Sequence, residues 1–194
     1  MVRRGFKPWA EETAVRVRKE LSLSLAAPLD PFKLAESLSV PVLAPEELND
    51  LPDECKGRLQ IEHSDNWSAV TVTIGKEHLV ILNSAHDVVQ RKIDLAHELA
   101  HVILHHESSN LFATPGGSIA LRIYGTEQNE EASWLAACLL LPRDALFYIR
   151  RRGLTDEEAC AEYGITEATL RFRCGAGGDV QLRRTQRFTQ LRKR

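Results

Sequence analysis

The sequence has few of the features that mark membrane-spanning, secreted or disulfide-stabilised proteins. Its longest apolar run, Leu135 to Leu141, is far too short to cross a bilayer. We see no N-terminal signal peptide, because Met1 to Arg4 leads into polar sequence rather than an apolar segment. No C-x-x-C pair, and hence no zinc ribbon or redox dithiol, occurs among the four cysteines, Cys55, Cys138, Cys160 and Cys174. We therefore expect a soluble, cytoplasmic protein with reduced cysteines and no membrane association.

Neither sign of charge is in excess, since 25 Lys and Arg residues stand against 27 Asp and Glu residues. This balance argues against a protein that binds nucleic acid through its overall charge. One segment departs from it: from Arg171 to the C-terminus eight residues are basic and only Asp179 is acidic. The length of 194 residues and the hydrophobic fraction of 43% are sufficient for one well-packed domain with a short extension.

Hydrophobic periodicity and turn residues predict mainly helices. They are expected over Trp9–Leu21, from Asp30, from a capping box at Ser84 and Asp87 to about His106, over Glu127–Leu141, and in short segments from Asp144, Thr155 and Thr166. The β-branched segments Ser68–Ile74 and His78–Leu82 predict a hairpin, and residues 107–125 are predicted to form a loop. This order indicates an α+β fold. We divide the chain into an N-terminal helical part (1–50), a core with short C-terminal helices (51–178) and a basic tail (179–194).

The chemistry of the sequence is concentrated in the motif His97-Glu98-Leu99-Ala100-His101, in the middle of the longest predicted helix. The two histidines are four residues apart, so both project from one helix face and can bind one metal ion. Nitrogen ligands in this arrangement suit zinc. Glu98 lies about 100° around the helix from His97, where its carboxylate can act as general base on an attacking water. The motif predicts a zinc-dependent hydrolase with His97 and His101 as ligands and Glu98 as the catalytic residue.

Two solvated histidines on a helix would give the same letters by chance. The surrounding sequence favours metal binding, because the helix is apolar on most sides and its histidines are expected to be partly buried and to need partners. His105 continues the same face, but its Cα would lie roughly 12 Å from that of His97, too far for both to bind one ion comfortably. We expect a structural or outer-shell role for His105 and an exposed position for His106.

A catalytic zinc takes three protein ligands and keeps one position open, so a further ligand is expected from a second helix. The predicted helix 127–141 is the best source, because its small residues would allow a close approach to the motif helix. Its first turns offer Glu127, Asn129, Glu130 and Glu131.

Several segments together resemble the ImmA/IrrE family of metallopeptidases. The resemblance rests on Asp94–His101 and Glu131–Pro142, and it extends to the segments around Gly5, Asp30 and Ala159, so that it covers most of the chain. It implies a mostly helical, zincin-like metallopeptidase domain with a small β-sheet beside the H-E-x-x-H helix. It also implies a zinc-dependent endopeptidase that acts on a specific regulatory protein, often a helix-turn-helix transcriptional repressor.

The resemblance also assigns roles to residues, and at one of them this sequence differs. His97, His101 and Glu98 match the zinc ligands and the catalytic glutamate of the family. The family's third ligand, a glutamate, stands four residues before Ser133, where this sequence has Asn129. Asparagine is a poor zinc ligand compared with a carboxylate.

The substitution leaves the third ligand open. We predict that Glu130 completes the site, with Asn129 or another residue as the alternative. Glu131 should face nearly away and form a helix-surface charge. Weakened metal binding or a degenerate enzyme is the further consequence to be considered.

Two other functions remain in competition with the peptidase. One is a catalytically weak or inactive scaffold of the same fold that binds a regulatory partner. The other is a DNA-binding regulator, because Thr155–Arg171 is predicted to form helix, glycine turn and helix, with arginines nearby. We favour short helices that complete the peptidase domain, so that direct binding of nucleic acid is not expected.

Overall fold

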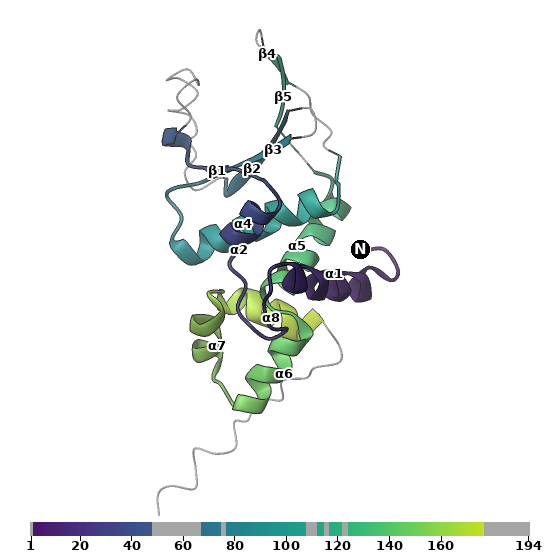
Figure 1. The fold of residues 1–194 in the computed structure, drawn as a ribbon, viewed down its shortest axis with the longest axis vertical. Coiled ribbons are helices and arrows are strands. Elements are labelled where there is room, and N and C mark those ends of the chain that lie inside the picture. Colours follow the sequence, from purple (N-terminus) through teal and green to yellow (C-terminus); the bar gives the residue numbers. More distant parts are fainter. Residues whose placement is uncertain are drawn as a thin grey trace, which may run out of the picture.

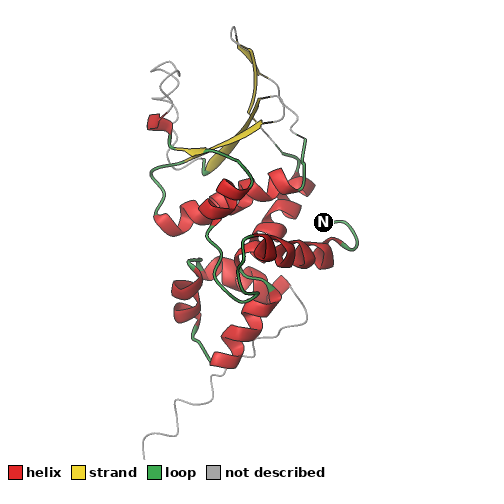
Figure 2. Ribbon diagram, viewed as in Figure 1, coloured by secondary structure: helices red, strands yellow, loops and turns green. Residues whose placement is uncertain are grey.

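The computed structural model describes residues 2–47, 67–74, 77–107, 112–114, 117–121 and 124–176, and it confirms the α+β class. Helices dominate these residues and one small sheet accompanies them (Figure 2). The helices are α1 (Phe6–Glu20), α2 (Pro31–Ser37), α4 (Val88–Ile103), α5 (Thr126–Leu140), α6 (Arg143–Arg152), α7 (Asp156–Tyr163) and α8 (Glu167–Ala176), with a 3-10 turn η1 (Pro45–Glu47). The strands are β1 (Val42–Leu43), β2 (Ala69–Ile74), β3 (Glu77–Leu82), β4 (Phe112–Thr114) and β5 (Gly117–Leu121).

The five strands form one sheet in the order β1-β3-β2-β5-β4. The predicted hairpin is its centre, with β2 antiparallel to β3 and Val72 opposite Leu79. β1 joins β3 in parallel, and β5 pairs antiparallel with β2. The predicted loop over residues 107–125 was therefore wrong in part, because β4 and β5 lie within it.

Helix α4 lies between the sheet and the other helices. Figure 1 shows the sheet along one side of α4, with α5 and α1 on the other side and α6, α7 and α8 at the far end. Leu95 and Leu99 of α4 share one buried core with Phe6 of α1 and Leu135 of α5. The core thus crosses the domain boundary that was predicted at residue 50.

The ends of α4 differ from the prediction. Asp87, rather than Ser84, is the N-cap, and its side chain accepts a hydrogen bond from the Gln90 backbone N–H. The Ser84 hydroxyl instead donates to Glu46. The helix ends at Ile103, three residues before the predicted end. Elsewhere the predicted caps are confirmed, at Asp30, Thr155 and Thr166, whose side chains each accept from a backbone N–H.

Several expectations concern cysteines, the tail and membranes. Cys138, Cys160 and Cys174 are free thiols, and burial raises the pKa of the Cys138 thiol to about 12. Cys55 and the predicted basic tail lie outside the described residues. Within the described ranges no single helix is long and apolar enough to cross a membrane. Only α5 and α6 taken together, bent by 47° at their junction, meet that length and composition.

Candidate metal centre

The two motif histidines converge on the same point beside α4. The Nε2 atoms of His97 and His101 lie 3.1 Å apart, with the rings nearly edge to face. Two nitrogens bound to one tetrahedral zinc at about 2.0–2.1 Å would be about 3.3 Å apart. The pair is therefore spaced as two ligands of one ion. His101 is fully buried and His97 half-buried, as the apolar surroundings of the motif predicted.

Glu98 follows His97 in α4, and a residue of the sheet hydrogen-bonds its side chain. Its side chain is only 8% exposed, and the hydroxyl of Thr71 on β2 donates a hydrogen bond to its carboxylate. Thr71 is itself buried. The sequence contains no local signal for this contact, because the two residues are 27 positions apart and meet only through the packing of β2 on α4.

Helix α5 faces His97 with two uncharged side chains one turn apart. The Ser133 hydroxyl lies 3.4 Å from His97 Nδ1, and the Asn129 side chain is close enough to raise the pKa of His97. The Asn129 amide nitrogen also donates to the Tyr124 carbonyl oxygen at 3.1 Å. The position at which the resemblance implies a glutamate ligand is thus occupied by a neutral amide beside the first histidine.

Burial has the largest effect on the charge state of His97. It lowers the pKa of His97 more than the hydrogen bond to Asn129 and the charge of Asp94 raise it. A lowered pKa favours the neutral imidazole, which is the form that can bind a metal.

Glu130, the predicted third ligand, is not brought to this point. Its residue is exposed, and among the described residues no group of three or more His, Cys, Asp or Glu side chains is arranged to hold a metal ion. The reason is helical geometry, since Glu130 is rotated by about 100° from Asn129. The structure therefore gives no support to Glu130 as a ligand and places Asn129 next to His97 instead.

Three expectations near the end of α4 are wrong. His106 is buried rather than exposed, and it is His106, not the exposed His105, that contacts His101. His105 has a positive φ of 51°, so the chain reverses there and directs His106 back toward His101. Glu131 is not a surface charge either, because it is 9% exposed and lies 3.4 Å from His106 Nε2.

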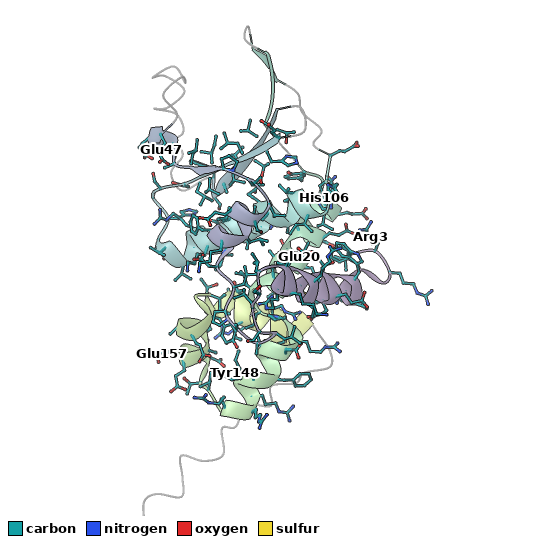
Figure 3. The ribbon with its side chains drawn as sticks, viewed as in Figure 1. Arg3, Glu20, Glu47, His106, Tyr148 and Glu157 are labelled. Carbon is teal, nitrogen blue, oxygen red and sulfur yellow. The ribbon has the colours of Figure 1, made fainter. Side chains whose placement is uncertain are left out.

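One aromatic side chain of the site was not identified from the sequence. The Tyr124 ring is stacked on the His101 ring, with the centroids 3.4 Å apart and an interplanar angle of 12°. Tyr148 lies on α6, well away from His106 (Figure 3). Tyr124 therefore covers one face of the second motif histidine.

The residues of this site fit a zinc ion in part. Two neutral imidazoles converge at a suitable spacing, and a buried carboxylate lies beside them. The third protein position carries an amide rather than a carboxylate. The donor set thus lacks one negative charge compared with a two-histidine, one-glutamate zinc site.

Comparison with known proteins identifies one family. A family model described as the IrrE N-terminal-like domain, of a peptidase family, matches residues 58–174, more than half of the chain. The chain belongs to this family. The match contains the motif helix, the sheet hairpin and helices α5 to α7, so it confirms the resemblance stated above. No curated protein and no solved structure matches the chain. Membership supports a metallopeptidase-type function.

Proposed function

We propose that this protein is a zinc-dependent endopeptidase in which His97 and His101 hold the metal and Glu98 is the catalytic residue. The observation that supports this most strongly is the 3.1 Å approach of the two histidine Nε2 atoms beside a buried glutamate, in a chain of a peptidase family. Asn129 is the third protein position that we favour on geometry. Glu130 stays the alternative.

In the proposed reaction, Glu98 acts first as general base and then as general acid. Its carboxylate accepts a proton from the attacking water and later donates it to the amine leaving group, so that the carboxylate is regenerated. Thr71 orients this carboxylate through its hydroxyl hydrogen bond. When bound, zinc would supply Lewis-acid polarisation of the scissile carbonyl and would make the attacking water more acidic.

We further propose that the substrate is one regulatory protein, a helix-turn-helix transcriptional repressor, and that the enzyme acts in the cytoplasm. The family resemblance of the motif segments supports the substrate class. The burial of His101 and Glu98 supports selectivity, because a polypeptide must be presented in a particular way to reach them. Both the partner and the compartment stay predictions.

The experiment is metal analysis of the purified protein combined with a cleavage assay on a repressor encoded beside its gene. Glu98→Gln should retain zinc and lose about 100-fold or more of the cleavage rate, because general acid-base catalysis contributes about 10²–10⁴-fold. Glu157→Gln, an exposed carboxylate on α7, is the matched control and should cleave normally. A fully active Glu98→Gln protein would contradict the proposal.

A scaffold that binds its partner without cleaving it is the second candidate, and Asn129 is the observation that favours it. An uncharged third position weakens metal binding. Purified protein without zinc, with repressor binding intact, would support the scaffold and exclude the endopeptidase. The DNA-binding alternative is less favoured, because Arg173 of α8 is buried. Its guanidinium donates hydrogen bonds to the Leu141 carbonyl oxygen and to the Glu11 carboxylate.

A further inference from the structure

A chain of polar side chains extends from the second motif histidine away from the metal centre. His101 Nδ1 lies 2.9 Å from His106 Nδ1. His106 Nε2 lies 3.4 Å from a carboxylate oxygen of Glu131, whose other oxygen is 3.2 Å from Arg3 Nε. His101, His106 and Glu131 are all buried, and the Arg3 side chain is mostly exposed. Figure 3 shows His106 at the end of α4, on the side where the N-terminal segment with Arg3 lies.

The backbone brings these residues together from three parts of the chain. The turn at His105 lets the His106 backbone N–H donate to the His101 carbonyl oxygen at 3.1 Å. This turn places the His106 side chain against the ring of His101, which lies five residues earlier in the chain. Glu131 comes from α5, where it faces His106 while Asn129 faces His97.

The hydrogen bonds are consistent with one set of ring protons. The carboxylate of Glu131 can only accept, so His106 donates from Nε2, and with a neutral His106 ring Nδ1 is unprotonated. That Nδ1 accepts from His101, which must then carry its proton on Nδ1. The Nε2 lone pair of His101 is left directed at the point shared with His97, where the proposed zinc would bind. The partner of a ligand's second ring nitrogen sets which nitrogen binds the metal.

We infer that His106 and Glu131 are positioning residues that fix the Nδ1-protonated tautomer and the ring orientation of His101, and thereby prepare its Nε2 as a metal ligand. The ligand role of His101 rests on the proposed function, whereas its tautomer is a property of the metal-free protein as well. Arg3 balances the charge of Glu131 at the outer end of the chain of contacts.

The tautomer is tested directly by ring nitrogen chemical shifts of His101 in the metal-free protein. The wild type should show protonation at Nδ1. His106→Phe, which keeps an aromatic ring and removes the acceptor, should show the Nε2-protonated form or a mixture. His106→Gln retains an acceptor oxygen and should restore part of the wild-type shift, which also covers the case in which His106→Phe does not fold. Nε2 protonation in the wild type, or identical shifts in wild type and His106→Phe, would overturn the inference.

Zinc affinity is the second measurement, by competition with a chelating dye. His106→Phe and Glu131→Gln should each weaken zinc binding about 10- to 100-fold, the usual effect of removing an outer partner of a metal-bound histidine. The matched controls are His105→Asn, at the adjacent exposed histidine, and Glu127→Gln, at an exposed carboxylate on the same helix; both should bind as the wild type does.

The outcomes separate this inference from the proposed function. Wild-type affinity in both His106→Phe and Glu131→Gln would overturn the inference and leave the zinc site intact. A wild type that binds no zinc but shows the Nδ1 tautomer would overturn the proposed function and support the positioning role.

Discussion

Helices α4 and α5 meet at the candidate metal centre and offer it different chemistry. From α4 come two imidazoles and a carboxylate within five consecutive residues, in the arrangement that an H-E-x-x-H motif predicts. From α5 come an amide and a hydroxyl, Asn129 and Ser133, while the buried carboxylate of that helix, Glu131, turns to His106. The residues of α4 therefore match the motif, whereas α5 lacks the carboxylate ligand that the resemblance implies, so metal affinity should depend on α5 more than the motif suggests.

The largest effect on zinc binding is expected when a proposed ligand is removed from α4. His97→Ala should abolish measurable zinc binding, with a larger loss than the about 10- to 100-fold expected for outer partners. His97 is half-buried, so the truncation costs little folding stability compared with truncating the fully buried His101. Metal content after gel filtration is the measurement, with thermal unfolding as the control for folding. Zinc retained at wild-type stoichiometry would exclude His97 as a ligand.

The converse change adds a carboxylate to α5 at the position that faces His97. Asn129→Glu should raise zinc affinity by about tenfold or more, because a carboxylate then faces the metal in place of an amide. Asn129→Gln, which lengthens the side chain without adding charge, is the matched control and should show no such gain. Dissociation constants from dye competition would decide, and equal affinities for Asn129→Glu and the wild type would show that this position does not reach the metal.

Loss of the hydroxyl that holds Glu98 should have an intermediate effect. Thr71→Val keeps the shape of the side chain and removes the donor, so the proposed cleavage rate should fall about tenfold, at unchanged zinc content. Thr71→Ser retains a hydroxyl and should keep most of the rate. The rate at saturating substrate is the quantity to compare, since a change in substrate affinity alone would point to a different role for Thr71.

The smallest effect is expected at Glu130. Because Glu130 is exposed and forms no metal-binding group with His97 and His101, Glu130→Gln should change zinc affinity by no more than about twofold. A large loss, comparable to that of His97→Ala, would instead establish Glu130 as the third ligand and reverse our preference for Asn129.

The sequence was sufficient for the elements that depend on local signals. The caps at Asp30 and Thr155 and the hairpin of β2 and β3 were predictable, because each rests on residues close together in the chain. β4 and β5 were missed, since three- and five-residue strands leave no clear periodicity and form only by pairing with the rest of the sheet.

The sequence by itself determined the inner part of the site. A four-residue spacing on an apolar helix brings His97 and His101 to one face wherever that helix packs, and Glu98 follows from the helical rotation. Only the tertiary structure decided what surrounds them. Whether Asn129 or Glu130 faces His97 depends on the rotation of α5 against α4, and the burial of His106 depends on a turn at His105 that no periodicity encodes. The physical reason is that contacts between elements depend on packing, whereas contacts within a helix depend on its repeat.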